Sequence, residues 1–358
     1  FKESNKEIFE QKSALIIIDE AHEGNETQMA NDVHEQLERR FTLYLSGTPF
    51  KYLDGGAFEQ KEIDSWTYVD EQKAKKEWNN SDGDNPYEML PKMWMHIIDL
   101  EQGMREKYIT DNSFFNFDEM FKVSNKKFVN EDDVKAFLEV IRKQSTGTED
   151  HAFSAMPFSE KLKEQTRHSL WTLPSVNACI ALETLLKADK FFTEYTVNNV
   201  AGNKVGTPLI SVEESMGITE KGADKTPFTT KTITLTVGRL TTGVTVKPWT
   251  TVLMLSNMTS ASTYMQTIFR AQSPFEFEGK LKTDCFIYDF APDRLLKVFS
   301  EVSNVGVKAG DEIDIEPREA LDTLLTYLPI LSYIDNPDLC KYDAQQLVKK
   351  LALILVSW

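Results

Sequence analysis

The stretch that decides the fold is LIIIDEAH, from Leu15 to His22, in which a run of apolar residues ends in the acid pair Asp19 and Glu20. Consecutive apolar residues are typical of a strand buried on both faces of a parallel sheet, because a half-exposed strand alternates apolar and polar side chains. Ligands of open α/β sheets bind beyond the carboxyl ends of the strands. The two carboxylates are therefore expected where a phosphate and its metal ion could be held.

A second apolar run, LYLSGTPF at residues 43–50, ends in a turn. Its glycine and proline break the strand, and the hydroxyls of Ser46 and Thr48 can bridge polar groups at the same sheet edge. Residues 27–40, between the two runs, read as one surface helix, which predicts a strand, helix, strand unit. Taken alone, SGTP is equally well an ordinary turn.

The second half of the chain predicts another α/β unit. A helix is expected at about residues 175–188, directly after Pro174. Strands are expected at residues 168–173, 191–197, 232–237, 251–255 and 285–290. Strands that alternate with helices indicate a parallel sheet covered on both faces.

A glycine-containing loop, GRLTTGVTV at residues 238–246, follows directly on the strand predicted at 232–237. Gly243 permits close approach of the backbone to a ligand, and Thr241 and Thr242 offer hydroxyls. A phosphate-facing loop would lie here, although two glycines and two threonines after a strand could also form any turn.

A helix is predicted within SASTYMQTIFRAQSP, residues 260–274. Ser260 or Ser262 can cap its start, and the proline can end it. Gln266 and Arg270 then lie one turn apart on a single face. Alone, such a pair is usually a solvated helix face.

The order DEAH, SGTP, GRLTTG and QTIFRAQS resembles motifs II, III, V and VI of superfamily 2 helicases and translocases. The resemblance implies two RecA-like domains that bind ATP and Mg²⁺ between them. By this resemblance Asp19 holds the Mg²⁺ and Glu20 activates the attacking water. His22, Thr241 and Gly243 would contact the nucleotide.

The same resemblance places Gln266 and Arg270 in catalysis, pointing across the cleft at the terminal phosphate, where an arginine neutralises developing charge. It gives coupling and nucleic-acid contacts to Ser46, Thr48, Thr242 and Arg239. The chain departs from the family's Q-x-x-G-R-x-x-R, since Phe269 replaces the glycine and Ser273 the second arginine. The identity of the arginine finger is therefore open, with Arg270 preferred and Arg239 a substitute.

IFRAQSP and YDFAPDR, the latter at residues 288–294, look most like the motor (Res) subunits of bacterial type III and related restriction enzymes. This implies an ATP-dependent DNA translocase or helicase core that moves along duplex DNA through backbone contacts. Its partners would be a nuclease, methyltransferase or specificity module. The alternatives are a catalytically silent RecA-like scaffold and an RNA-remodelling helicase.

No G-x-x-x-x-G-K-[ST] phosphate loop occurs in the chain. In the family this box precedes DEAH, so we expect an amino-terminal part of the first RecA-like domain to be missing. The full-length protein is expected to be an ATP hydrolase. This chain alone is expected to be inactive, because the loop supplies the β- and γ-phosphate contacts.

Composition constrains the partners and the compartment. The net charge of -16 gives no global attraction to nucleic acid, so any DNA contact must be local. Three distant cysteines suit a reducing cytoplasm and oppose a disulfide scaffold or a cysteine metal site. No apolar run reaches membrane-spanning length, and a cytoplasmic protein of bacterial or phage origin is expected.

The predicted fold class is α/β, with two RecA-like parallel-sheet domains, a mostly helical insertion and a helical carboxyl-terminal extension. Residues 1–66 would be the carboxyl-terminal part of the first domain, and residues 67–166 its remainder plus the insertion. Residues 167–300 would be the second domain, and 301–358 an extension leading to a missing module. Helices are expected at residues 69–78, 87–102, 131–143, 321–331 and 344–356.

The insertion also mixes positive charge with aromatic rings. These side chains could form a nucleic-acid clamp, or they could be ordinary helix surface and core, because many nearby acids cancel the charge. They are Lys73, Lys75, Lys76, Trp66 and Trp78.

Overall fold

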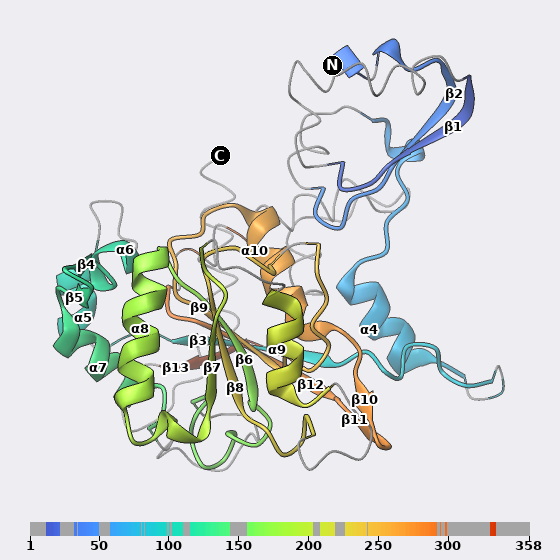
Figure 1. Cartoon of the computed structure of the whole chain (residues 1–358). Helices are drawn as coiled ribbons and strands as arrows, with labels where there is room; N and C mark the ends of the chain where they lie inside the picture. Colours follow the sequence, from blue (N-terminus) through green and yellow to red (C-terminus); the bar gives the residue numbers. More distant parts are fainter. Residues whose placement is uncertain are drawn as a thin grey trace.

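The structure is a computed structural model of the whole chain, shown in Figure 1. It describes residues 12–21, 32–33, 35–49, 58–79, 81, 83–98, 100, 102–109, 115–143, 156–202, 208–218, 226–241, 243–291, 294, 298 and 330–333. Within these residues, no helix is long and apolar enough to cross a membrane.

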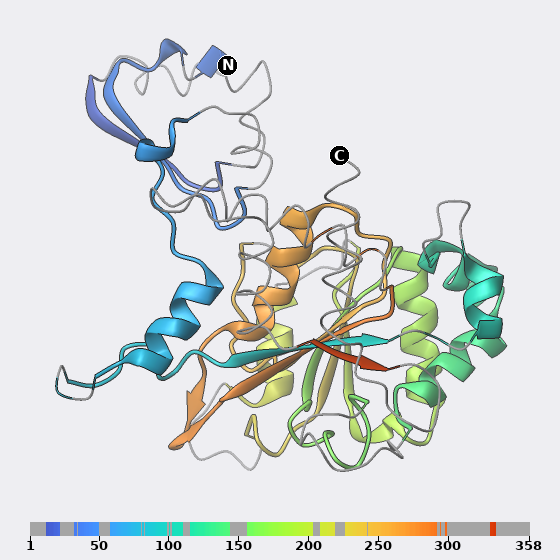
Figure 2. The same cartoon turned by 180° about the vertical axis from the view of Figure 1, so that it is seen from behind.

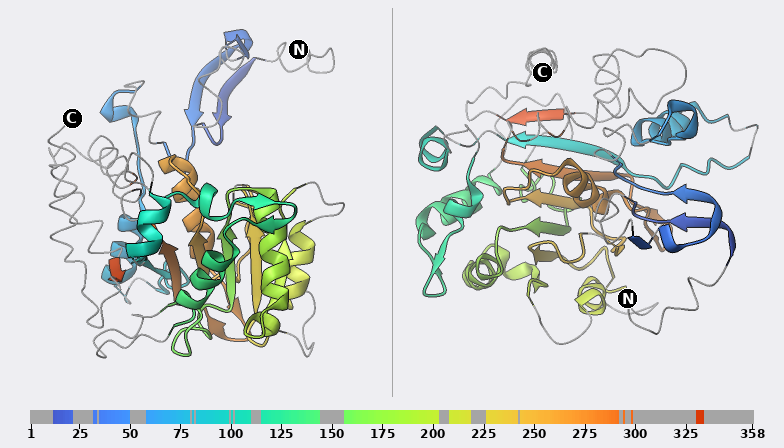
Figure 3. Two further views of the ribbon diagram at one scale, coloured as in Figure 1. Left: turned by 90° about the vertical axis from the view of Figure 1, so that its left-hand side faces the viewer. Right: turned by 90° about the horizontal axis from the view of Figure 1, so that it is seen from above.

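The main body is built on one seven-stranded sheet, the large sheet, whose strand order is β13-β3-β12-β9-β6-β8-β7. Every pair of neighbours in it is parallel, and the view from above in Figure 3 shows strands of this sheet side by side. The strands are β3 (Lys92–Ile98), β6 (His168–Thr172), β7 (Thr196–Asn199), β8 (Thr232–Thr236), β9 (Thr251–Met254), β12 (Asp284–Asp289) and β13 (Ile330–Tyr333). The α/β fold class predicted from the sequence is confirmed.

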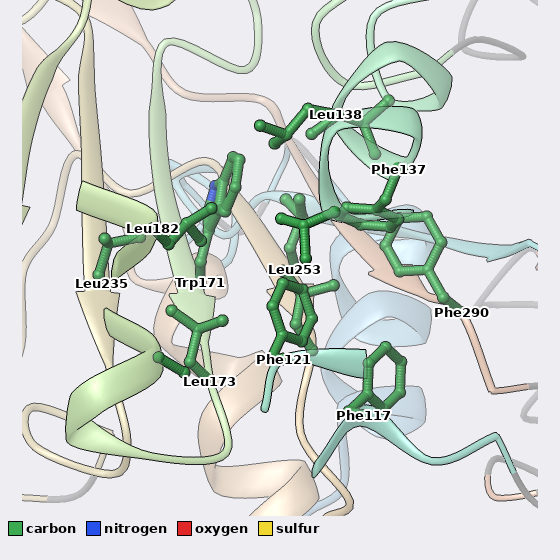
Figure 4. Packing of buried hydrophobic residues seen from close by; sticks show 14 of the residues in the cluster. Phe117, Phe121, Phe137, Leu138, Trp171, Leu173, Leu182, Leu235, Leu253 and Phe290 are labelled. Carbon is green, nitrogen blue, oxygen red and sulfur yellow. The ribbon is translucent and has the colours of Figure 1, made fainter. Parts of the chain in front are cut away.

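One face of the large sheet packs against α8 (Val176–Ala188) and against α6 (Phe117–Met120) and α7 (Glu131–Val140). Phenylalanines from α6 and α7 meet Trp171, Leu253 and Phe290 in this layer, as Figure 4 shows. The Ser175 side chain accepts from Ala178 N and caps α8.

The opposite face packs against α9 (Pro208–Met216) and α10 (Ala261–Ile268), which continues as the 3₁₀ turn η5 (Phe269–Gln272). Neighbouring residues of one strand enter opposite layers, since Leu253 lies in the first core and Val252 in the second. The central strands are therefore covered on both faces, and every residue of β6, β8 and β9 is buried, the threonines included.

A separate two-stranded sheet, the small sheet, contains β1 (Ser13–Ile18) and β2 (Arg39–Tyr44) in parallel register. Figures 1 and 2 show it beyond the end of α10, away from the large sheet. Leu15 and Ile17 are 49% and 58% exposed, so the prediction that β1 is buried on both faces is wrong for the described residues. The reason is that a lone pair of strands covers neither of its own faces.

The helix predicted at residues 87–102 is also wrong, because residues 92–98 form β3 between β12 and β13. We expected part of this insertion to complete the first sheet, but β3 belongs to the large sheet instead. A strand buried on both faces and a buried helix have similar composition, and the pairing partner decides between them.

Of the other helices and strands predicted from the sequence, some are confirmed and others are not. The helix 69–78 is confirmed as α4 (Tyr68–Glu77), with a capping box at Thr67. Of the strand predicted at 191–197, only the end belongs to β7, after the 3₁₀ turn η4 (Phe192–Glu194). The last two residues of the helix predicted at 321–331 lie in β13. The helix predicted at 344–356 lies outside the described residues.

The remaining helices and strands are short. They are η2 (Gln60–Glu62), α5 (Gln102–Tyr108), β4 (Val123–Ser124), β5 (Lys127–Phe128), β10 (Glu276–Phe277) and β11 (Lys280–Leu281). The domain limits expected from the sequence stay predictions.

The side chains suggested as a nucleic-acid clamp, on α4 and next to it, make contacts within the chain instead. Lys75 donates to the backbone oxygens of Glu88 and Leu90, at 2.8 and 2.9 Å, and so holds the segment that leads to β3. Trp66 and Trp78 both pack on the Tyr87 ring. These contacts are those of helix surface and core.

Candidate functional site

The acid pair forms a tight turn directly after β1. Asp19 Oδ1 accepts from Glu20 N at 2.9 Å, and Glu20 has a φ of +50°. Ala21 N then donates to Leu45 O at 2.9 Å, so the turn is fastened to the end of β2. Both carboxylates are exposed at the carboxyl end of the strand, as the sequence predicted.

The turn after β2 reaches the large-sheet side of the molecule. Thr48 N donates to Ser46 Oγ at 3.2 Å, and the Thr48 side chain is buried at 2% exposure. Thr48 Oγ1 lies 2.6 Å from Ser262 Oγ and accepts from Gln266 Nε2 at 3.2 Å. Two residues of α10 thus contact the SGTP turn that follows β2.

Arg270 follows α10 in η5, one turn after Gln266. Its Nε donates to Thr241 O at 2.8 Å and to Gln266 O at 3.2 Å, and its Nη1 donates to Val244 O at 2.6 Å. Burial lowers the pKa of the Arg270 guanidinium, and the Glu20 carboxylate opposes this shift. An acid from the small sheet therefore acts electrostatically on the arginine from the large sheet.

The loop after β8 is built by its own hydroxyls. Thr236 Oγ1 donates to Arg239 O at 2.6 Å, and Thr241 Oγ1 donates to Gly238 O at 2.7 Å. Arg239 Nη1 donates to Gly202 O at 2.8 Å, so in this structure Arg239 binds backbone of its own side. Gly243 has a φ of +65°, a conformation that favours glycine.

One departure from the family pattern in the α10 segment, Phe269, has a structural reason. The Phe269 ring lies 6.3 Å from that of Tyr68 on α4, and Gln272 Nε2 donates to Glu71 Oε2 at 2.9 Å. Burial raises the pKa of the Glu71 carboxyl, and the bond from Gln272 opposes that shift. A glycine at position 269 would lose this packing against α4.

Sequence reasoning missed one residue of the site and left two predicted residues untested. Ser260, not Ser262, is the N-cap of α10, which leaves Ser262 free to face Thr48. Only the tertiary contact separates the two serines, because both precede the same apolar pattern. His22 and Thr242 lie outside the described residues.

The residues that meet here fit Mg²⁺ and a nucleotide. Asp19 and Glu20 offer the hard oxygen ligands that Mg²⁺ prefers, and Mg²⁺ usually takes only one or two carboxylates beside phosphate and water. An added Cβ at Gly47, in the turn after β2, would meet nothing within 4 Å, so a ligand can approach this turn.

The chain is similar to known restriction enzymes. Residues 1–51 match the family described as "Type III restriction enzyme, res subunit". A curated protein of Mycoplasma pneumoniae, "Putative type II restriction enzyme and methyltransferase RM.MpnORF110P C-terminus", is 32% identical over 292 residues, covering 75% of this chain and 39% of that protein.

A solved structure, "ATP-dependent Type ISP restriction-modification enzyme LlaBIII bound to DNA", matches 99% of this chain and 24% of its own with a TM-score of 0.50 and 14% identity. These similarities relate the chain to restriction enzymes, and its first 51 residues to their res subunits. A fragment of a type I HsdR subunit from Vibrio vulnificus is 16% identical, with a TM-score of 0.46, over 90% of this chain and 49% of that one. The chain thus spans less than half of the length of these relatives.

Proposed function

We propose that this chain is the core of an ATP-driven DNA translocase in a restriction enzyme. The observation that carries the proposal is the contact between the two sheets, in which Gln266 binds Thr48 while the Glu20 charge acts on Arg270. Residues that the sequence places in four separate motifs therefore gather around one site. Such a gathering is what hydrolysis between two RecA-like lobes requires.

In this proposal Asp19 would hold Mg²⁺, directly or through water, and Glu20 would orient or deprotonate the attacking water. Bound Mg²⁺ would neutralise charge on the β- and γ-phosphates. Gln266 and Arg270 would reach the terminal phosphate from the other side, and Thr241 and Gly243 would face the nucleotide. Arg270 must then exchange its bonds to Thr241 O and Val244 O for phosphate oxygens, which are stronger acceptors.

DNA is the proposed track, since the solved relative named above is described as bound to DNA. Ser46, Thr48, Thr242 and Arg239 would couple the nucleotide state to the grip on the phosphate backbone. With a net charge of -16 the chain has no general affinity for polyanions, so this grip must be local. A nuclease or methyltransferase module is the proposed partner, and a bacterial or phage cytoplasm remains the predicted location.

A silent scaffold is the second candidate, and one observation favours it. The Arg270 side chain already donates to three carbonyl oxygens of its own side, as a purely structural arginine would. The exposed acid pair at the end of β1 favours the motor, because a scaffold does not need two carboxylates at this position.

The test is ATP turnover by the full-length protein with Glu20→Gln, which keeps the shape of the side chain but removes the base. We expect the DNA-stimulated rate to fall at least about hundredfold, with ATP still bound, because only the chemical step loses its base. Turnover is measured with duplex DNA, with RNA and without nucleic acid. Glu38→Gln, on the surface of the small sheet, is the matched control and should change nothing.

Each outcome decides between the candidates. Wild-type turnover stimulated by duplex DNA supports the translocase, and stimulation by RNA alone supports a remodelling enzyme. A full-length protein without any stimulated turnover would leave only the scaffold. Normal turnover by Glu20→Gln would remove Glu20 from its proposed role.

A further inference from the structure

Beneath α10 lies a fully buried polar cluster that the proposed mechanism does not use. Tyr264 of α10 and Asp289 at the end of β12 are 0% exposed, and Arg294 is 5% exposed. Asp289 Oδ2 accepts from Tyr264 Oη at 2.8 Å, and Asp289 Oδ1 accepts from Arg294 Nη2 at 2.6 Å and from Ala291 N at 2.8 Å. The segment YDFAPDR, singled out in the sequence, thus provides two of its three members.

Arg294 extends the cluster to the connection between β9 and α10. Its Nη2 also donates to Met254 O at 3.3 Å, and its Nη1 donates to Ser256 O. The guanidinium lies 5.4 Å from the Phe117 ring centre and 6.0 Å from that of Tyr264. One side chain therefore holds the end of β9, the loop that follows and the helix itself.

The next residue of the loop carries the connection to α6. Asn257 Oδ1 accepts from Phe117 N at 2.9 Å, and its Nδ2 donates to Asn116 Oδ1 at 2.9 Å and to Asp118 Oδ2 at 2.6 Å. The start of α10 is therefore fixed from two sides by hydrogen bonds. A buried ion pair is a costly way to fix the start of this helix, since apolar residues of similar volume often stabilise a protein equally well.

We propose that Tyr264, Asp289 and Arg294 are positioning residues that set the place of Gln266 and Arg270 relative to the nucleotide. Tyr264 precedes Gln266 by two residues and Arg270 by six on the same continuous stretch of α10 and η5. A shift of the helix would move both side chains away from the terminal phosphate. The inference rests on the proposed function, because it assigns these residues to the same ATP site.

The test uses Tyr264→Phe in the full-length protein, since it removes one hydroxyl and keeps the ring. We expect kcat for DNA-stimulated ATP hydrolysis to fall about tenfold or more, because small misplacements of catalytic groups are costly. KM for ATP should stay within about twofold, since the binding contacts of the other lobe remain. Arg294→Lys, which keeps the charge but loses the fork, should act in the same direction.

Tyr195→Phe is the matched control. Tyr195 is also buried, but its hydroxyl has no hydrogen-bond partner among the described residues. The change to phenylalanine therefore removes an oxygen without breaking a hydrogen bond. Its melting temperature and kcat give the baseline for a tyrosine-to-phenylalanine change in this core. Tyr264→Phe should melt somewhat below this control, because Asp289 loses one donor. Its lower kcat should persist at temperatures at which both variants are fully folded.

A mutant cycle with Arg270→Ala separates positioning from general stability. Single-turnover rates with enzyme in excess should show that Tyr264→Phe adds no further loss once Arg270 is gone. An equal loss in both backgrounds, or an unchanged kcat in Tyr264→Phe, would overturn the proposal. A wild-type protein without DNA-stimulated turnover would instead contradict the proposed function, so the two failures are distinguishable.

Discussion

Single residues carry two kinds of energetic cost in this protein, which are backbone strain at the site and burial of ionisable rings in the core. At the site, Glu20 adopts a φ of +50° although it is not glycine, which costs on the order of 1 kcal/mol. The conformation turns the chain back toward β2 immediately after Asp19. In the core, two buried histidines are held neutral, because burial lowers the pKa of His96 to about 3 and that of His168 to about 4.

The lowered pKa of the buried His168 ring predicts how the stability of the protein depends on pH. Its Nε2 lies 2.8 Å from Pro227 O and its Nδ1 lies 3.0 Å from Thr232 Oγ1, an arrangement that suits a neutral ring. The folded-state pKa lies below the unfolded value of about 6.5, so stability is complete above that pH and is lost as pH falls toward 4. We expect a loss of roughly 1.4 kcal/mol per pH unit in this window.

Urea denaturation followed by tryptophan fluorescence at pH 7 and pH 5 measures this effect. His168→Gln, which cannot be protonated, should lose less stability between the two pH values than the wild type. An identical pH slope in both proteins would mean that the folded state accommodates a charged ring at this position.

Among the elements, α10 carries most of the site, and its start decides which residues face the small sheet. Ser260 accepts from Thr263 N and caps the helix, whereas Ser262 points to Thr48. The helix also packs on the large sheet through Tyr264 and Ile268, so its orientation is set by the core. The same short segment therefore serves folding through one serine and the site through another.

Substitution of the two serines should separate the stability of α10 from the contact between the two sheets. Ser260→Ala should lower the free energy of unfolding by about 1 kcal/mol, because one orphan backbone donor loses its acceptor. Ser262→Ala should change stability by less than about half of that, because its bond is made at the surface between the sheets. Thermal unfolding of both variants checks this, and the opposite ranking would reassign the cap.

At the scale of the whole molecule, two sheets meet through few polar contacts. Thr48 binds Ser262 and Gln266, and no comparable apolar core joins the small sheet to α10 in the described part of the chain. Hydrogen bonds contribute about 1 kcal/mol each, so such a contact can be exchanged when a nucleotide binds. This suits an engine that closes on ATP and reopens after hydrolysis.

Thr48→Val tests that contact, since it keeps the shape and removes the hydroxyl. Losing both bonds should cost the closed arrangement about 1 to 2 kcal/mol, which shifts its population roughly tenfold. Spin labels at the exposed positions Lys12 and Lys187, one on each side, should then report a longer and broader distance distribution without nucleotide.

The control for this experiment lies on the same small sheet. Thr42 Oγ1 accepts from Arg39 Nε at 2.6 Å, so Thr42→Val breaks a bond within the sheet and should leave the label distances unchanged. The labelling background replaces Cys340, while Cys179 and Cys285 are buried and can stay. Equal distances in wild type and Thr48→Val would show that other contacts hold the sheets together.

The sequence by itself determined the α/β class, the helix at α8 and the strands at β6, β8, β9 and β12. It could do so because local periodicity and capping residues act over a few neighbours. The order of the motifs also predicted that Thr48 and Gln266 belong to one site. The structure places these two side chains in contact, and their roles stay predictions.

Tertiary structure decided what depends on partners distant in sequence. The run at β3 became a strand because β12 and β13 lie on either side of it. Leu15 and Ile17 are exposed because β1 has only β2 beside it among the described residues. Asp289 and Arg294 acquired their contacts with α10 because the sheet brings segments together that are far apart in the chain, and no local pattern records such a pairing.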